Sequence, residues 1–141
     1  MVTGADSSLV VADRRLRVLV VEDDPLIAMD VAETIEDAGA ELVGTAATAD
    51  DALALATGMA PDVAVIDLSL KSRGDGLSVA DAIRKRCGAV TLFITGSAGA
   101  ETIERVRAFN GSSPLFKPLR YGELPAAILR ALRQAKAGKQ I

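Results

Sequence analysis

Polar residues that could do chemistry stand at the ends of four apolar segments of this 141-residue chain. If these segments are strands of one parallel sheet, their carboxyl ends meet at one edge, where open α/β folds bind ligands. Three carboxylates, a hydroxyl and an ammonium would then surround one point, a set that suits a divalent cation and a phosphoryl group. The residues, in chain order, are Glu22, Asp23, Asp67, Thr95, Gly96, Lys117 and Pro118.

The acidic pair Glu22 and Asp23 is the first candidate for a metal site. Adjacent carboxylates beside a buried strand repel each other and lose solvation unless a positive group joins them. Mg²⁺ is held in proteins by one or two carboxylates together with waters and phosphate oxygens, so Mg²⁺ is the expected cofactor. Asp24 is expected to cap the next helix. The alternative is that all three acids only decorate a helix N-terminus, where the dipole favours negative charge.

Asp67 closes the apolar run 63–66 and could act in two ways. It could be a third metal ligand, or its carboxylate could attack phosphorus and form an acyl phosphate. The alternative is an aspartate that only forms a turn.

Thr95 and Lys117 are suited to the phosphoryl group itself. The Thr95 hydroxyl can donate to a phosphoryl oxygen, Gly96 would let the backbone approach, and Lys117 is a compact positive charge. Pro118 fixes the following turn, a setting in which cis peptide bonds occur. Singly, Thr95 could just end a strand and Lys117 could be a surface residue. Their occurrence in order at successive strand ends argues against coincidence.

The elements that must position these residues alternate along the chain. Near-continuous apolar runs predict strands covered on both faces, over residues 17–21, 41–46, 62–66, 90–95 and 114–116. Between them, apolar residues recur at the spacing of helices. Asp24 and Pro25 predict a helix start, and Gly39 and Gly88 predict helix ends. The pattern predicts an α/β fold of the (βα)5 type, a doubly wound parallel sheet.

Length and composition set the limits on this domain. One core is expected over residues 15–136, with a flexible tail at 1–14 and a frayed end at 137–141. The net charge of −3 offers no basic surface for nucleic acid. The absence of histidine excludes histidine-based catalysis and most zinc sites, and the single Cys87 excludes an internal disulfide. With no signal peptide and no membrane span in the sequence, a cytoplasmic location is expected and no membrane partner.

These residues and their order resemble the receiver domain of two-component response regulators, over about residues 16–135. The resemblance implies a flavodoxin-like fold with strand order 2-1-3-4-5. It implies that Asp67 is the phosphoacceptor, and that Thr95 and Lys117 bind and sense the phosphoryl group. It also implies a Mg²⁺ site whose ligands are Glu22, Asp23, Asp67 and the backbone carbonyl of Ser69.

The resemblance further implies a signalling switch rather than an enzyme. Asp67 would take a phosphoryl group from a sensor histidine kinase or a histidine phosphotransfer protein, and the change in charge would alter binding of a downstream protein. Ser69 and Ser97 would tune the lifetime of the acyl phosphate. The face formed by the fourth and fifth helices, including Arg105, Arg107 and Tyr121, is the expected partner surface, with an ordinary solvated surface as the alternative.

Three features depart from the common receiver pattern. Pro114 stands where the family carries its switch aromatic, so the usual coupling of threonine and aromatic is not expected. A receiver subgroup with a Phe-x-Thr-Gly strand end is similar, although its aromatic falls on Ala98 here. The loop 71–76 is longer and more charged than usual. No output module follows residue 135 in this sequence, so a stand-alone receiver is expected.

Three other functions compete with this interpretation. An aspartyl phosphatase of the haloacid dehalogenase class uses similar residues, but its nucleophile follows the first strand, where Glu22, Asp23 and Asp24 stand here. A flavodoxin-like cofactor binder would need amide and hydroxyl groups in that loop. A degenerate receiver, binding partners without phosphorylation, is the third alternative, and the presence of the full residue set argues against it.

Overall fold

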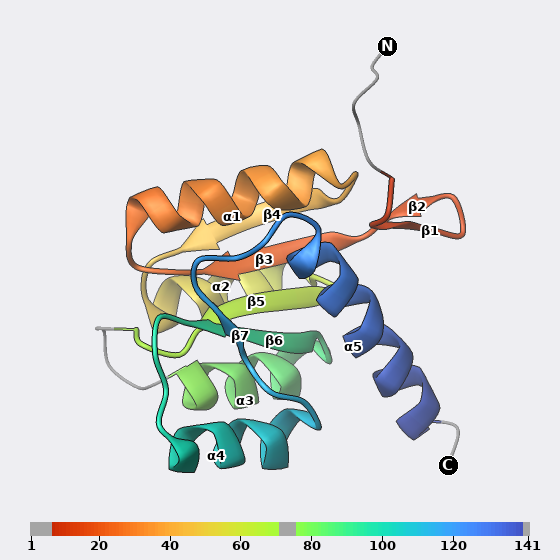
Figure 1. Cartoon of the computed structure of the whole chain (residues 1–141). Helices are drawn as coiled ribbons and strands as arrows, with labels where there is room; N and C mark the ends of the chain where they lie inside the picture. The colour runs from red at the N-terminus through yellow and green to blue at the C-terminus, as the bar shows by residue number, and fades with distance from the viewer. Residues whose placement is uncertain (1–6, 71–75, 140–141) are drawn as a thin grey trace.

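A five-stranded parallel sheet forms the centre of the computed structural model, which describes residues 7–70 and 76–139. The spatial order of its strands is β4-β3-β5-β6-β7 (Figure 1). Counted along the chain from β3, this is the order 2-1-3-4-5, so the predicted flavodoxin-like fold is confirmed. The strands are β3 (Arg17–Val21), β4 (Glu41–Ala46), β5 (Val63–Asp67), β6 (Val90–Thr95) and β7 (Leu115–Phe116).

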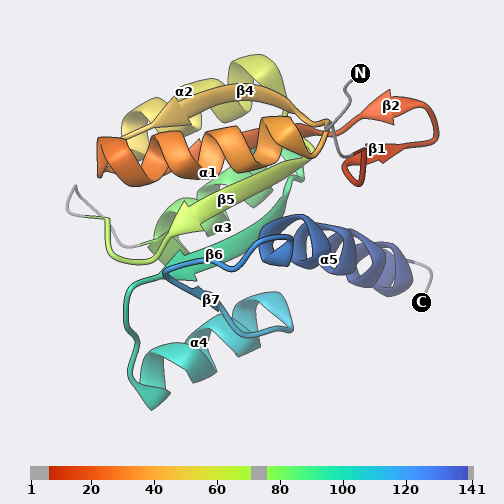
Figure 2. The ribbon, with the colours of Figure 1, turned by 45° about the horizontal axis from the view of Figure 1, so that its top comes forward.

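Helices cover both faces of the sheet (Figure 2). The helices α1 and α5 pack on one face, where Ile35 and Ile128 contact the core, and α2, α3 and α4 pack on the other. Two apolar layers therefore hold the sheet between them. The helices are α1 (Pro25–Asp37), α2 (Ala49–Met59), α3 (Gly76–Cys87), α4 (Ala100–Asn110) and α5 (Glu123–Lys139).

Local sequence signals fix the turn from β3 into α1. The Asp24 carboxylate accepts hydrogen bonds from the backbone N–H groups of Leu26 and Ile27, at 2.9 and 3.3 Å, and Pro25 is the first helical residue. Gly39, with a φ of 95°, follows the end of the helix, as expected of a residue that terminates it. The cap therefore fixes the backbone between β3 and α1, the segment that carries Glu22 and Asp23.

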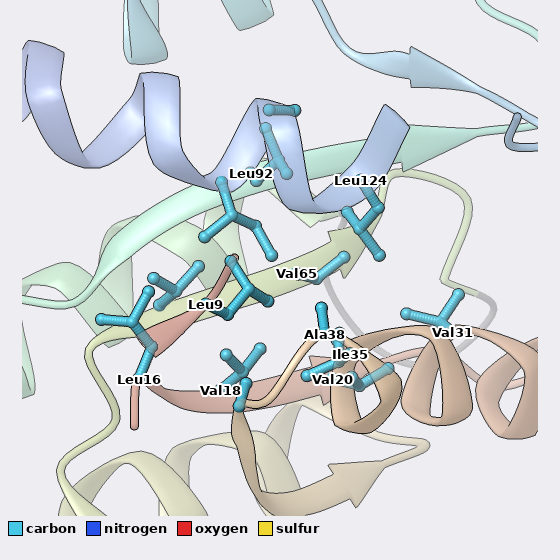
Figure 3. Packing of buried hydrophobic residues seen from close by; sticks show 14 of the residues in the cluster. Leu9, Leu16, Val18, Val20, Val31, Ile35, Ala38, Val65, Leu92 and Leu124 are labelled. Carbon is cyan, nitrogen blue, oxygen red and sulfur yellow. The ribbon is translucent and has the colours of Figure 1, made fainter. Parts of the chain in front are cut away.

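The N-terminal segment differs from its prediction as a tail. An antiparallel hairpin lies at the end of this segment, in which β1 (Val10–Val11) pairs with β2 (Arg14–Arg15). Leu9 is fully buried against α1, α5 and the sheet (Figure 3). Arg15 donates to the carbonyl oxygens of Gly39 and Ala40, at 2.9 and 2.8 Å. The buried leucine and these hydrogen bonds anchor the segment, and residues 1–6 lie outside the described part.

The C-terminal helix α5 continues to Lys139, inside the segment where fraying is predicted. Residues 140 and 141 lie outside the described part of the chain. Among the described residues, no helix combines the length and the apolar character needed to cross a lipid bilayer.

Candidate functional site

An open pocket of about 540 Å³ lies at the carboxyl ends of β3 and β5. In the sheet Val21 pairs with Ile66, so the next residues of the two strands, Glu22 and Asp67, are neighbours at the sheet edge. The parallel sheet thus brings together residues 45 positions apart in the sequence, as predicted. The lining residues are Glu22, Asp23, Asp24, Pro25, Leu26, Ile27, Asp67, Ser69 and Lys117.

Three carboxylates form an acidic cluster in this pocket. One oxygen from each of Glu22, Asp23 and Asp67 lies within 4.8 Å of the other two. Glu22 and Asp67 are each only 3% exposed, and Asp23 is half-buried. Carboxylate oxygens so arranged could hold a small divalent cation, because its charge would offset their repulsion and lost solvation.

Lys117 directly follows β7, the strand at the other edge of the sheet, and its side chain contacts the acidic cluster. Its Nζ is 2.8 Å from Glu22 Oε1 and 3.5 Å from Asp67 Oδ2. Its backbone N–H donates to the carbonyl of Thr95 at 2.8 Å, and its peptide bond to Pro118 is cis. Burial lowers the pKa of Lys117, but the hydrogen bond to Glu22 and the charges of both carboxylates outweigh that effect, so the pKa is raised. The ammonium is therefore charged at neutral pH.

The surroundings of Glu22 raise its pKa. Burial, together with a hydrogen bond to the Asp67 carboxyl and the negative charge of Asp67, raises the pKa of Glu22 from 4.5 to about 7. The hydrogen bonds from Lys117 and from the backbone N–H of Asp24 act in the opposite direction. One lysine thus compensates the buried acids only in part, and the pocket favours a further positive charge.

The turn after β5 fixes the orientation of Asp67. The backbone N–H of Ser69 donates to Asp67 Oδ1 at 3.0 Å, and the N–H of Leu68 donates to the carbonyl of Ile94 at 3.0 Å. Asp67 itself pairs with Ile94 in the sheet. Its other carboxylate oxygen, Oδ2, is the one near Lys117. Both oxygens therefore have defined neighbours.

Thr95 lies beside the pocket rather than in its lining. It is fully buried at the end of β6, and its hydroxyl donates to the carbonyl of Ser97 at 2.8 Å. Gly96 and Ser97 are exposed in the loop that leads to α4. Of the predicted site residues, Glu22, Asp23, Asp67, Ser69 and Lys117 line the pocket, and the lining does not include Thr95, Gly96, Ser97 or Pro118.

The structure describes some of the features in which the sequence departs from the common receiver pattern. Pro114 is buried just before β7, and it has no aromatic side chain that could rotate outward. Arg105, Arg107 and Tyr121 are exposed, so the predicted partner face remains a prediction. Residues 71–75 of the long charged loop lie outside the described part.

The ion pair between Lys117 and Glu22 was not predictable from either residue's surroundings in the sequence. The two residues are 95 positions apart, and no local pattern connects them. The pairing follows from the order of strands, because β3 and β7 lie on opposite sides of β5 and β6.

Comparison with known proteins agrees with this geometry. Residues 18–129 match the family described as the response regulator receiver domain. The chain is 34% identical over 112 residues to the transcriptional regulatory protein PdtaR of Mycobacterium tuberculosis H37Rv, which covers 79% of this chain and 54% of that protein. It is 30% identical over 125 residues to the phyllosphere-induced regulator PhyR of Methylorubrum extorquens, covering 86% and 45%. The chain thus spans about half the length of these relatives.

Solved structures give the same result. The signal receiver domain of a modulated diguanylate cyclase from Desulfovibrio desulfuricans matches with a TM-score of 0.78 and 29% identity, covering 88% of this chain and 98% of that one. The response regulator PhyR from Brucella abortus matches with a TM-score of 0.72 and 30% identity, covering 94% and 52%. The family match, these likenesses and the acidic pocket at the sheet edge agree, and the chain belongs to the response regulator receiver domain family.

Proposed function

We propose that this chain accepts a phosphoryl group on Asp67 from the phosphohistidine of a sensor histidine kinase or a histidine phosphotransfer protein. The observation that carries the proposal is the clustering of three carboxylates and the Lys117 ammonium in one open pocket. Asp67 is held between Ser69 and Lys117 with its carboxylate in the pocket lining, where an incoming phosphorus atom can reach it.

The pocket also fits a divalent cation. The donor set is three carboxylates within 4.8 Å, and the raised pKa of Glu22 indicates uncompensated negative charge. Glu22, Asp23, Asp67 and the backbone carbonyl of Ser69 would hold the ion. When bound, Mg²⁺ would neutralise these acids and orient the oxygens of the phosphoryl group.

The chain's own residues supply the remaining steps. A carboxylate oxygen of Asp67 attacks phosphorus, an O–P bond forms, and the N–P bond of the donor breaks as the imidazole leaves with its electron pair. Lys117 is near enough to shift from Glu22 toward a new phosphoryl oxygen, because its Nζ already lies between Glu22 and Asp67. Water later attacks the acyl phosphate and returns Asp67 to its carboxylate form.

Thr95 would carry the signal from the pocket to the loop before α4. Its hydroxyl now donates to the carbonyl of Ser97, and one hydroxyl proton can serve only one strong acceptor at a time. A phosphoryl oxygen on Asp67 would compete for that proton. Thr95 would then release Ser97, and the loop would change the population of its conformations.

Phosphorylation by a small donor tests the proposal without a known kinase. Purified protein is incubated with acetyl phosphate and Mg²⁺, and intact mass reports the added phosphoryl group. We expect labelling of the wild type and of Asp50→Asn, an exposed control in α2, and none of Asp67→Asn. Lys117→Ala should fold but should lose the response to labelling, because the phosphoryl charge is then poorly compensated.

Three outcomes would contradict the proposal. Equal labelling of Asp67→Asn and wild type would show that another residue is the acceptor. No labelling and no Mg²⁺ binding by the wild type would favour the degenerate receiver that acts only by binding. Turnover of a generic phosphomonoester would instead favour an aspartyl phosphatase.

A further inference from the structure

Gly76 is the first residue of α3, and it is buried directly behind the acidic pocket. It belongs to the face of α3 that packs on the sheet, together with Val79, Ala80 and Ile83. This spacing of three, four and seven residues places the four positions along one side of the helix. Gly76 therefore lies on the side of α3 that faces the sheet.

The space behind Gly76 is filled by the backbone of the phosphoacceptor. A Cβ at position 76 would lie 2.7 Å from the carbonyl oxygen of Asp67 and 2.9 Å from Cα of Leu68. Both distances are shorter than any ordinary contact to a Cβ, and the crowded atoms belong to the main chain. Main-chain atoms cannot rotate away as the end of a side chain can, so any residue other than glycine must displace α3 or the segment from Asp67 to Leu68.

Neither partner can move freely. The helix is held by Val79 and Ile83, which are buried in the apolar layer between α3 and the sheet. The opposing segment is held by the hydrogen bond from Leu68 N–H to Ile94 and by the pairing of Asp67 with Ile94. A displacement of either one would therefore shift the residues at the end of β5, which carry the Asp67 carboxylate and lead to the backbone of Ser69.

We infer that Gly76 is a positioning residue that sets the place of the Asp67 carboxylate and the Ser69 carbonyl from behind. The inference rests on the proposed function, since it concerns the same pocket. The pocket depends on short distances: 3.5 Å from Asp67 Oδ2 to Lys117 Nζ and 4.8 Å across the three carboxylates. Reacting groups that are misplaced by about 1 Å lose on the order of a hundredfold in rate, so a shift of a few tenths of an ångström is enough to matter.

The test is Gly76→Ala in the full chain, compared with two other glycines. Gly44→Ala also crowds a neighbour, but that neighbour is Cδ1 of Leu55 at 2.8 Å, the end of a flexible side chain that does not line the pocket. Gly58→Ala meets nothing within 4 Å and lies in α2, where alanine is the better helix former. Stability by urea unfolding, Mg²⁺ affinity by titration, and the rate of labelling by acetyl phosphate are measured for each variant.

A fourth measurement, amide hydrogen exchange, can be made without Mg²⁺. Hydrogen exchange of the Leu68 and Ser69 amides reports directly on the turn, because these amides bond to Ile94 and to the Asp67 carboxylate. We expect faster exchange of these two amides in Gly76→Ala, with Mg²⁺ affinity and labelling rate lower by about tenfold or more. Gly44→Ala and Gly58→Ala should keep the wild-type Mg²⁺ affinity, labelling rate and exchange of these two amides, each compared per folded molecule.

The inference is overturned if Gly76→Ala loses stability but keeps wild-type Mg²⁺ affinity, labelling rate and amide exchange per folded molecule. If the single variant does not fold, the double variant with the stabilising Gly58→Ala is used. Failure of that double variant to fold would make Gly76 a purely structural residue and would also overturn the inference. If the wild type neither binds Mg²⁺ nor is labelled, the proposed function fails, while amide exchange still decides whether Gly76 positions the turn.

Discussion

At the scale of single residues, the charge of the pocket depends on whether Glu22 is ionised. It is buried beside Asp67, and its compensating partners are the Lys117 ammonium and the backbone N–H of Asp24. A buried acid next to another acid keeps its proton to a higher pH than it would in water, and this is why its pKa is raised to about 7. A bound divalent cation would act on Glu22 in the opposite direction and favour the ionised form.

The raised pKa of Glu22 predicts a pH dependence of stability in metal-free protein. Between pH 4.5 and about 7 the folded state binds more protons at Glu22 than the unfolded state does. The free energy of unfolding should therefore fall, through this group, as the pH rises across that range, and should level off above it. Urea unfolding at a series of pH values measures the slope. Glu22→Gln is the matched control, since it keeps the size of the side chain and cannot ionise, and identical slopes for both proteins would refute the assignment.

Mg²⁺ should reverse the slope that Glu22 causes. The ion competes with the proton at Glu22, so its affinity should weaken as the pH falls below about 7. In Glu22→Gln this part of the pH dependence should be absent, together with most of the affinity. A change in the sign of the pH dependence on adding Mg²⁺ would distinguish a metal site from a buried acid that binds no ion.

At the scale of elements, the side-chain hydrogen bonds and the cation–π contact that connect α4 to its neighbours lie mainly at its C-terminal end. Asn110 Nδ2 donates to the carbonyl of Thr91 at 2.8 Å, and the Thr91 hydroxyl donates back to Asn110 Oδ1 at 2.9 Å. The Arg84 guanidinium lies 3.9 Å from the centre of the Phe109 ring. At the N-terminal end the N-cap residue is Gly99, which offers no side-chain hydrogen bond, and the preceding loop is held by the hydrogen bond from the Thr95 hydroxyl to the carbonyl of Ser97.

This asymmetry predicts that α4 loosens at its N-terminal end when Thr95 changes partner. Thr95→Val removes the hydroxyl while keeping the shape, and it should raise amide exchange in the loop 97–99 and the first turn of α4. Thr91→Val is the matched control on the same strand, because its hydroxyl bonds to the other end of the helix. Each variant should cost about 1 kcal/mol or somewhat more, because a hydrogen bond is lost. Loosening of the same end in both variants would contradict the prediction.

Beryllofluoride bound with Mg²⁺ should produce the Thr95→Val pattern in the wild type. The phosphoryl analogue offers the Thr95 hydroxyl a stronger acceptor than the Ser97 carbonyl, so the loop should be released without any substitution. In Thr95→Val the analogue should add little further exchange in the loop 97–99. A switch of this kind uses no aromatic ring, which is consistent with Pro114 at the position where receivers carry one.

At the scale of the whole molecule, the sequence predicted what is encoded locally and in the strand pattern. Asp24 and Pro25 marked a helix start because capping is a short-range signal. The carboxylate cluster followed from strand ends that meet at one edge. The hairpin of β1 and β2 was missed because its turn uses Ala12 and Asp13 at φ of 53° and 62°, where glycine or asparagine is the usual signal. The contact of Gly76 with Asp67 was missed because a close approach leaves no periodic pattern.

The hairpin contributes to the stability of the whole domain through Leu9, which is fully buried between α1, α5 and the sheet (Figure 3). Leu9→Ala should lower the free energy of unfolding by about 2–5 kcal/mol, because the truncation removes apolar burial and leaves a cavity. Val11→Ala, on the same hairpin but 41% exposed, should cost far less. Urea unfolding measures both. Because the hairpin lies at the end of the sheet remote from the pocket, labelling of Asp67 per folded molecule should be unchanged in either variant (Figure 1). Equal stabilities of Leu9→Ala and wild type would mean that the segment is the loose tail that its composition suggests.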